Sequence, residues 1–289
     1  WFNATKGFGF VKLPDGADTD LIQQSGYAEN KTFANLYFGL RDIALDGNKA
    51  KNKRGNLVVI RGFRGMLENV RIIRAADHGL LYSEVSADGT SNLNNLAETR
   101  VAKCYFDDCD GAGLHGNNDH RNQIADMFVT DSVFRNNGQK GYYQIDLERS
   151  AGFHIKGNQM YGAKFGDVRA LQAGALIVAL NNFDGTDTKP EEGVVRQVLI
   201  ETRGWGNVVV SSNLFHFAGT RLPEGAKFHH LELVTKVPSA IAVSGNSFRS
   251  APPVESDAVV HRGTVGAHMT FEPNAYGVGV RRPSHNIAR

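Results

Sequence analysis

The sequence has little cysteine, no long apolar run and almost no net charge, and each shortage excludes a class of protein. Its only cysteines, Cys104 and Cys109, are too few for a disulfide framework and match no metal-binding spacing. We expect buried thiols, with a local disulfide as the alternative. No apolar run approaches the ~18 residues of a membrane-spanning helix, so we expect no membrane partner. A net charge of only +2 provides no general attraction for nucleic acids or acidic membranes.

Proline is also scarce, with 8 residues against 32 glycines, which suits many tight turns between short strands. With 41% hydrophobic and 21% charged residues, the sequence predicts an ordered protein rather than a disordered one. The chain begins at Trp1 rather than at a methionine. We therefore expect a processed or truncated start, where the lack of a visible signal peptide says little about targeting.

What the sequence does contain is a short strand segment, usually centred on asparagine, that returns along most of the chain. Its aligned positions recur after 24 to 34 residues, at Asn69, Lys103, Asp131, Asn158, Asn182, Asn213 and Asn246. Periods of roughly 20 to 50 residues indicate a repeat architecture. Short strands of branched and aromatic residues, with turns and no long helical stripe, make the repeat a β-coil. The predicted fold is all-β, a right-handed single-stranded parallel β-helix, or solenoid.

Polar stretches, several rich in Gly or Pro, lengthen some coils without breaking this pattern. They fall at residues 86–98, 184–193, 218–227 and 251–257, and we interpret them as surface loops. No linker divides the chain, so residues 1–289 are predicted to form a single parallel β-helix domain. Residues 1–36 are either an amino-terminal cap or the first coils.

Residues 1–11, Trp-Phe-Asn-Ala-Thr-Lys-Gly-Phe-Gly-Phe-Val, closely resemble the opening of bacterial cold-shock domains. That resemblance implies aromatic side chains that stack on single-stranded nucleic acid. The second aromatic-rich strand of that family is missing after Gly16, where residues 19–24 read Thr-Asp-Leu-Ile-Gln-Gln. We therefore expect no nucleic-acid partner. The aromatic residues are then part of an apolar face of the first coils or of an end cap: Phe2, Phe8 and Phe10.

Other segments resemble the pectate-lyase superfamily as it occurs in bacteriophage tailspikes. They are residues 46–50, 67–72 and 78–80, with residues 13–17 fitting the same pattern. The resemblance is one of coil style, and it implies an extracellular or virion-associated protein of the phage tail, often a homotrimer. It also implies cleavage of an extracellular or cell-surface polysaccharide, as a glycoside hydrolase or a polysaccharide lyase. Other members are carbohydrate epimerases or non-catalytic carbohydrate-binding or fibre segments, and fold alone does not fix function.

A candidate site follows from the stacking of equivalent positions in successive coils, ~4.8 Å apart. We align the coils on the glycines that precede three strands, Gly79, Gly113 and Gly141. Five residues further on, the aligned positions are Glu84, Asn118 and Asp146. Seven residues further on, they are Ser86, His120 and Glu148. Positions two apart share one face of a strand, so these two columns are predicted to flank each other.

Strand alternation predicts which side chains of these coils point outward. The expected outward residues are Tyr82, Glu84, Tyr142, Gln144, Asp146 and Glu148. The expected inward residues are Leu81, Val85, Tyr143, Ile145 and Leu147. The middle coil fits poorly, because alternation would send His115, Asn117 and Asp119 inward, and we predict a bulge near Gly116.

Such an outward patch suits a sugar polymer, with aromatic faces for the rings and carboxylates and amides for the hydroxyl groups. The predicted catalytic residues are Asp146, Glu148, Glu84 and His120. The predicted substrate-binding residues are Tyr82, Asn118, Tyr142, Gln144 and Arg149. No cofactor is predicted, since the sequence contains no phosphate-binding glycine loop, Ser-His-Asp order or dinucleotide motif.

The predicted backbone spacings are ~7 Å between Asp146 and Glu148 and ~9.6 Å between Glu84 and Asp146. Inverting glycosidases separate their carboxyl groups by ~6.5–9.5 Å and retaining ones by ~5–5.5 Å. The spacing therefore favours inversion, with one carboxyl as general acid and the other activating water.

Two alternatives remain open for this patch. A lyase would need a base near an acid-neutralising group, which His120, Arg121 and Arg149 can supply. Alternatively, the polar columns are ladders that satisfy backbone groups at turns, with Glu148 paired to Arg149 or His120.

Two further polar groups compete with the patch. Asp107, Asp108 and Asp110 follow a predicted strand and form either a cation site or a solvated turn. Residues 229–232, His-His-Leu-Glu, are a weaker metal candidate, because adjacent histidines point to opposite faces of a strand. No metal site is predicted.

Overall fold

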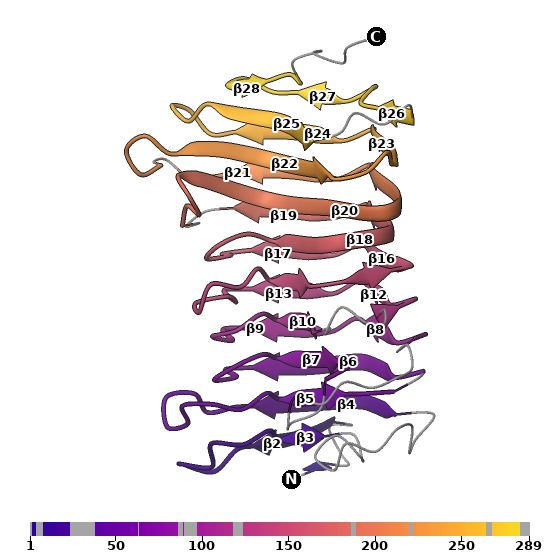
Figure 1. The fold of residues 1–289 in the computed structure, drawn as a ribbon. Coiled ribbons are helices and arrows are strands. Elements are labelled where there is room, and N and C mark those ends of the chain that lie inside the picture. The colour runs from indigo at the N-terminus through magenta and orange to yellow at the C-terminus, as the bar shows by residue number, and fades with distance from the viewer. Residues whose placement is uncertain are drawn as a thin grey trace.

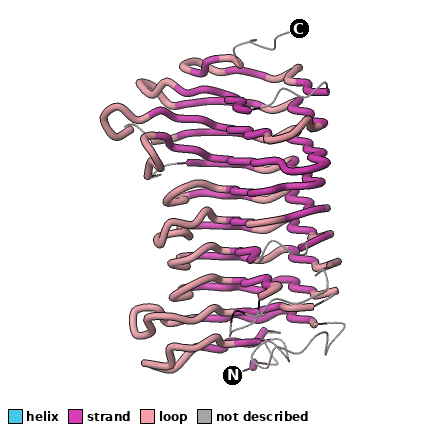
Figure 2. The backbone as a smooth tube through the Cα atoms, in the orientation of Figure 1, coloured by secondary structure: helices cyan, strands magenta, loops and turns pink. Residues whose placement is uncertain are grey.

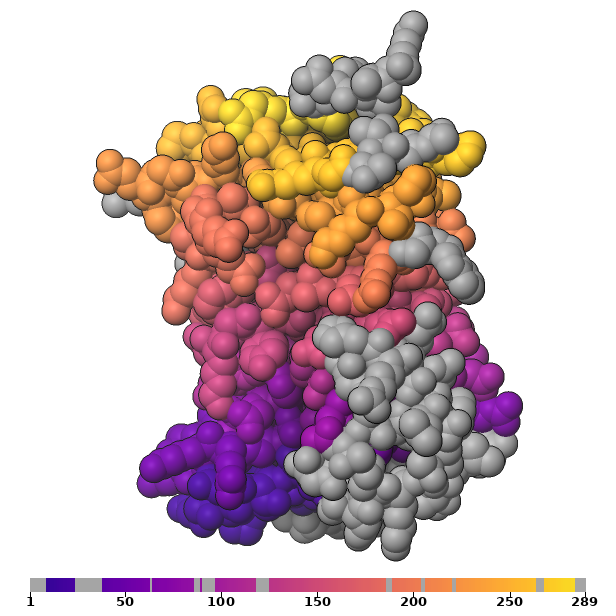
Figure 3. Space-filling view, viewed as in Figure 1, coloured from indigo at the N-terminus to yellow at the C-terminus, as the bar shows by residue number. Residues whose placement is uncertain are grey.

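The computed structural model describes residues 2–3, 8–23, 38–62, 64–85, 89, 97–117, 124–185, 189–219, 222–263 and 268–283. These residues form strands and turns, with no helix among them (Figures 1 and 2). The chain rises coil by coil from its amino-terminal to its carboxy-terminal end, and the coils appear as stacked bands on the molecular surface (Figure 3). The predicted right-handed parallel β-helix is confirmed.

Three parallel sheets form the sides of the coil, and we name them faces A, B and C. Face A contains the first parts of β4 (Gly39–Asp46) and β6 (Met66–Ile73), then β8 (Arg100–Ala102), β12 (Phe128–Thr130), β16 (Phe153–Lys156), the last parts of β18 (Val168–Ala179) and β20 (Val194–Ser211), β23 (Ala240–Ser244) and β26 (His268–Thr270). Face B contains β2 (Phe8–Lys12), the last parts of β4 and β6, β9 (Tyr105–Asp107), β13 (Val133–Arg135), β17 (Gln159–Tyr161), β19 (Asn182–Gly185), β21 (Leu214–Phe217), β24 (Ser247–Ser250) and β27 (Ala275–Tyr276).

Face C contains β3 (Ile22–Gln23), β5 (Val58–Ile60), β7 (Leu80–Ser83), β10 (Leu114–Asn117), β14 (Ile145–Leu147), the first parts of β18 and β20, β22 (Lys227–Thr235), β25 (Ser256–Gly263) and β28 (Val280–Arg281). Two small pairings lie outside the three faces. β1 (Phe2–Asn3) pairs antiparallel with β2, and β11 (Ile124–Ala125) pairs with β15 (Ser150–Ala151) at the corner between faces C and A.

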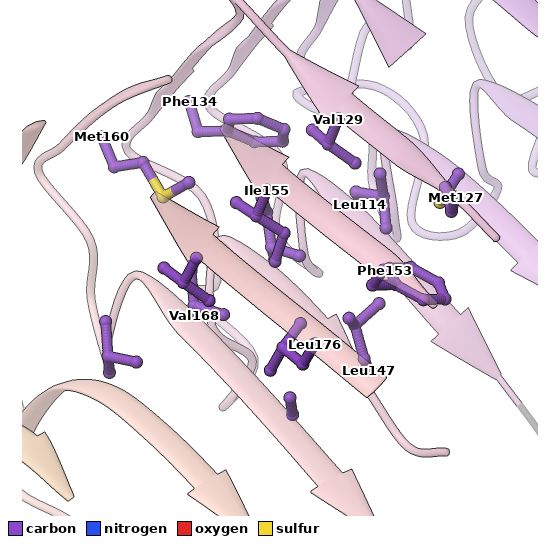
Figure 4. Close-up of a cluster of buried hydrophobic side chains, with 14 of the residues drawn as sticks. Leu114, Met127, Val129, Phe134, Leu147, Phe153, Ile155, Met160, Val168 and Leu176 are labelled. Carbon is purple, nitrogen blue, oxygen red and sulfur yellow. The ribbon is translucent and has the colours of Figure 1, made fainter. Parts of the chain in front are cut away.

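Inside the coil, equivalent apolar side chains stack in columns along the solenoid axis. Figure 4 shows such a cluster, with Phe134, Val129 and Leu114 pointing into the space between the faces. The rings of Phe183 and Phe215 have centroids 4.8 Å apart, close to the spacing of hydrogen-bonded strands. Because each coil buries its apolar face against its neighbours, stability comes from interfaces between coils.

Both cysteines lie in this interior as free thiols, as predicted. Burial raises the pKa of Cys104 to about 11 and that of Cys109 to about 12, so both thiols are protonated at neutral pH.

At the bend between faces A and B, asparagine side chains form a ladder. Asn181 Oδ1 accepts both the backbone N–H and the side-chain amide of Asn158, each at 3.0 Å. The same pattern continues upward through Asn213, Asn246 and Asn274. Each amide also donates to a backbone carbonyl group, so the ladder satisfies polar backbone groups that the bend buries.

The aligned positions that revealed the repeat lie at or beside this ladder. Asn69, Lys103 and Asp131 precede it by one residue and adopt left-handed backbone conformations, with φ between 51° and 56°. In the lower coils Ser132 serves in place of asparagine, since its hydroxyl accepts the backbone N–H of Cys104 at 3.0 Å. The repeat therefore marks a bend that needs a left-handed residue followed by a side-chain acceptor.

The cold-shock-like segment contributes to the first coils. β2 pairs in parallel with β4, and Phe10 is half-buried. Side chains at Phe2 and Phe8 lie outside the described residues, so their predicted apolar role stays a prediction. Among the described residues there is no helix with the length and apolar character needed to cross a membrane.

Candidate active site

The outer surface of face C carries a strip of polar and charged side chains from successive coils. Outward positions there are three residues apart rather than two: Tyr143 and Asp146 in one coil, His229 and Glu232 in a higher one. Two consecutive residues between them, such as His230 and Leu231, are both buried. This local irregularity in the strand places more side chains inside the solenoid than simple alternation predicts.

The coil alignment on Gly141 was wrong by three residues, because His115 pairs with both Leu81 and Asp146. Several predicted orientations are therefore corrected. Leu81 and Tyr143 were expected to point inward and lie at outward positions.

Tyr82 and Glu84 were expected to point outward and are fully buried. Gln144 is also buried, where its amide donates to Asp167 at 2.9 Å and its oxygen accepts from Asn137 at 3.1 Å. These side chains belong to the interior and not to an exposed patch.

The remaining predicted residues lie in several places. Asp146, Glu148 and Tyr142 are on the outer side of face C. Arg149 lines a hollow at the corner between faces C and A. Asn118 and His120 lie outside the described residues, so their predicted roles stay predictions.

Asp146 is buried by its own partners, with its side chain 1% exposed. Arg169 donates to it through Nε at 3.0 Å and through Nη2 at 2.7 Å, and the backbone N–H of Tyr143 adds a third hydrogen bond at 3.0 Å. Arg169 also contacts Glu191 at 3.4 Å, and Tyr143 donates to Glu191 at 3.0 Å. A carboxylate held by a two-pronged guanidinium contact positions other groups and is poorly suited to exchange protons.

Beside Asp146 the structure brings together His115 and Glu148, from neighbouring coils. His115 Nε2 lies 3.7 Å from Glu148 Oε1, and the Glu148 side chain is 38% exposed. His115 Nδ1 lies 3.1 Å from the backbone carbonyl oxygen of Asp146. Because a carbonyl group only accepts, Nδ1 carries the proton, and Nε2 of the neutral ring is a free base directed toward Glu148.

Burial lowers the pKa of His115 below its ordinary value of 6.5, although the nearby carboxylates of Asp146 and Glu148 oppose this. His115 is therefore neutral at pH 7. Alternation predicted an inward direction for this residue, which the structure contradicts. The missing signal was that Leu114 and His115 align with Ile145 and Asp146, so His115 shares the outward position of Asp146.

Two further rings enclose this pair. His78 stacks on His115 with centroids 4.4 Å apart, and Tyr142 meets His115 edge-on at 5.2 Å. His78 Nδ1 accepts the backbone N–H of Ala112 at 3.0 Å, so its proton is on Nε2, the opposite tautomer to His115. Burial lowers the pKa of His78 well below 6.5. His115 is therefore packed against two rings, with its side chain 6% exposed and its basic nitrogen facing a carboxylate.

A second charged group lies higher on face C. Glu232 accepts from Arg196 at 2.9 Å and contacts His229 Nδ1 at 2.7 Å and Arg262 at 3.1 Å. Burial alone raises the pKa of Glu232, but the hydrogen bonds from His229 and Arg196 lower it overall. Its neighbour His230 points inward instead, where it contacts Ser250 at 3.2 Å. The two histidines therefore face opposite sides, as expected for a strand.

The acidic turn after face B is occupied by a lysine. Lys49 Nζ donates to Asp108 at 2.8 Å and to Asp110 at 2.7 Å, and Arg135 lies 3.6 Å from Asp107. These ion pairs support the solvated-turn interpretation. Within the part of the chain that the structure describes, no group of three or more His, Cys, Asp or Glu side chains is arranged to hold a metal ion.

Comparison with known proteins gives one sequence relative, which matches part of this chain. No family model matches the sequence. The cold shock protein CspA of Rhizobium meliloti is 38% identical over 60 residues, which are 20% of this chain and 86% of that protein.

Two solved structures share its architecture at low identity. The tailspike protein of Pseudomonas phage LKA1 is 10% identical with a TM-score of 0.47, over 92% of this chain and 47% of that one. This chain therefore spans about half the length of the tailspike. The A-module of a mannuronan C-5 epimerase from Azotobacter vinelandii is 12% identical with a TM-score of 0.44, over 95% of this chain and 81% of that module.

Neither structural likeness adds to the strand pairing described above, which by itself establishes the coil. The chain is a right-handed parallel β-helix, and over one fifth of its length it belongs by sequence to the cold-shock protein family.

Proposed function

We propose that the chain cleaves an extracellular polysaccharide at the outer side of face C, with His115 and Glu148 as the reacting pair. The observation that carries this proposal is the neutral His115, whose unprotonated Nε2 lies 3.7 Å from Glu148. A histidine that acts as a general base needs an unprotonated nitrogen at the working pH, which the neutral His115 provides. The ring of Tyr142 beside them supplies a face for a sugar and a hydroxyl group.

β-Elimination is the reaction that this arrangement supports best. His115 Nε2 takes the proton from the carbon next to a sugar carboxyl group, and that electron pair forms a carbon–carbon double bond. The bond to the glycosidic oxygen breaks, and the leaving oxygen takes a proton from Tyr142. The carboxylate of Glu148 stabilises the imidazolium ion that forms, as carboxylates do beside catalytic histidines. Hydrolysis by two carboxyl groups is less well supported, because Arg169 occupies Asp146.

The first test is a panel of acidic and neutral bacterial polysaccharides, with reducing ends and ultraviolet absorbance of unsaturated uronates recorded together. We expect both signals to rise with an acidic polymer. Reducing ends without absorbance would indicate hydrolysis instead, and the absence of any product would contradict the enzyme proposal.

His115→Asn and Glu148→Gln test the assignment of the pair. Loss of a positioned acid or base lowers rates by roughly 10²–10⁴-fold, so we expect the turnover of each variant to fall in that range. Glu224→Gln, on an exposed loop, is the matched control and should leave turnover unchanged. The unaltered protein should lose activity as pH falls through a value below 6.5, because protonation removes the base. Full activity in His115→Asn would exclude the pair.

A second candidate is a non-catalytic carbohydrate-binding or fibre segment. It is favoured by the extent to which face C is neutralised internally, with Asp146 held by Arg169 and Glu232 by Arg196. Polymer binding without any product would select it.

The assembly and location implied by the resemblance belong to the same proposal: a homotrimer, extracellular or on a virion tail. Light scattering during size-exclusion chromatography would test it, and a mass of one chain would contradict the trimer.

A further inference from the structure

A second surface, separate from face C, runs along the corner between faces C and A. Two hollows meet there at Asp126, with volumes of about 550 Å³ and about 590 Å³. Together they extend from the coil of Arg64 to the coil of Arg203. These are five coil-to-coil steps of ~4.8 Å, about 24 Å in all. We name this surface the corner trench.

The upper half of the trench has a floor of small residues. Ala151 follows Ser150 in β15, and Gly174 and Ala175 lie one coil higher. At Gly152, φ is +69° and a Cβ atom would lie 2.1 Å from Asp126 Oδ1, so only glycine fits there. Because small side chains in neighbouring coils leave the strands uncovered, the surface is indented along the axis.

The walls of the trench carry groups suited to an acidic sugar. Arg149, Gln172, Arg203 and Asn207 line the upper hollow, and Arg203 is held by a hydrogen bond to Gln172 at 2.8 Å. Arginine pairs with carboxylate groups through two parallel hydrogen bonds, while amides match hydroxyl groups.

The lower hollow adds two more arginines and two carboxylates. Arg64 is paired with Glu98 at 2.7 Å, and Arg100 lies over the ring of Phe128 at 4.5 Å. Asp126 is the other carboxylate of the trench. Four arginines against two carboxylates leave the lining positive.

A buried hydroxyl group lies at the floor of the trench. Ser150 is 2% exposed and lines the upper hollow, yet its Oγ has no hydrogen-bond partner among the residues that the structure describes. Buried polar groups are usually paired, and an unpaired one is costly.

We propose that the corner trench binds a segment of an acidic polysaccharide, as a site distinct from the pair on face C. Its length fits an extended polymer rather than a compact ion, and its mixture of arginine, amide and hydroxyl groups fits a chain that carries carboxylate and hydroxyl groups. Binding at this site requires no chemistry and so does not depend on the proposed cleavage.

Affinity electrophoresis tests the proposal with three probes: polygalacturonate, dextran as a neutral polysaccharide, and poly-glutamate as an acidic peptide. Glu148→Gln is used as the parent, so that turnover does not destroy the probe. We expect retardation by polygalacturonate alone, decreasing with salt as exposed charges are screened. No retardation by polygalacturonate, equal retardation by dextran, or retardation only by poly-glutamate would overturn the proposal.

Two substitutions on this parent locate the binding. Arg203→Gln removes a charge-assisted contact and should weaken binding about tenfold. Ala175→Trp fills the trench from an exposed position without changing charge and should weaken binding at least as much. Arg249→Gln, which removes an exposed arginine from face B, should leave binding unchanged. Equal losses in Arg249→Gln, or unaltered binding in Ala175→Trp, would place the polymer elsewhere.

Discussion

Among single residues, Asp167 has the most unusual environment. It is buried inside the coil, accepts from Gln144 at 2.9 Å, and its Oδ2 has no hydrogen-bond partner among the described residues. Burial raises its pKa from 3.8 to about 7. The folded state therefore favours the protonated acid and must hold a buried charge once the pH exceeds that value.

The consequence for stability has a definite sign. The contribution of Asp167 is fully present below pH 3.8, declines as the pH rises, and is lost above about pH 7. Asp167→Asn removes this dependence, so we expect the variant to be more stable than the parent at pH 8 by about 1–4 kcal/mol, and not at pH 4. Urea unfolding at both pH values measures the difference. A difference that does not change with pH would contradict the assignment.

The sequence predicted the orientations of single side chains only in part. Asp146, Glu148 and Tyr142 were placed on the outer surface by alternation within their own coil, and they lie there. The alignment between coils was wrong, because Asp146 lies level with His115 and Leu81 rather than with Glu84.

Gln144 was predicted wrongly because two consecutive buried residues break the alternation in its coil. No local pattern indicates that break, since Gln144 is polar and is stabilised inside by hydrogen bonds to Asn137 of its own coil and Asp167 of the next. Tyr82 was predicted wrongly because the inward positions of its strand begin at Leu80 and not at Leu81.

Among structural elements, the asparagine ladder is the part most open to test. Asn213 Oδ1 accepts the backbone and side-chain N–H groups of Asn181, and its amide donates to Val178 and Asn246. Asn213→Ala leaves several buried polar groups without their hydrogen-bond partners at once. We expect a loss of about 2–4 kcal/mol in unfolding free energy, measured by chemical denaturation.

Asn182→Ala is the matched control, because Asn182 is half-buried on the outer side of face B. Substitutions of this kind usually change stability by less than ~0.5 kcal/mol. Similar losses in both variants would mean that the ladder contributes little beyond general packing.

The ladder also explains why the elements were predictable. A bend repeated in every coil requires the same local chemistry each time, so it appears in the sequence as a recurring asparagine. The sequence alignment of the repeat is accurate to about one residue: its aligned position Asn182 directly follows the ladder residue Asn181. Loop lengths vary between coils, and the contacts that loops form are not encoded by the repeat.

For the whole molecule, the stacking of coils predicts how far the destabilising effect of a core substitution extends along the chain. Phe215 lies between Phe183 and Phe248, with centroids 4.8 Å away on each side. Phe215→Ala should cost about 3–5 kcal/mol. Because each coil contacts only its neighbours, amide exchange should accelerate most in β19, β21 and β24 and least in β5 and β7.

Hydrogen exchange followed by mass spectrometry measures this gradient. Leu214→Ala removes the neighbouring side chain, which is 56% exposed, and should leave the exchange pattern unchanged. A uniform acceleration along the whole chain would instead indicate a single cooperative unit.

In this coil, the number of residues in a loop does not determine where the next strand lies. The register of each strand is set by its pairing with the equivalent strand of the coil below. A corner loop can therefore gain or lose residues while the ladder and the core columns keep their places. The spacing between ladder residues already varies, from 23 between Asn158 and Asn181 to 33 between Asn213 and Asn246. Such a scaffold lets new recognition loops be exchanged at one corner while the other faces are inherited unaltered.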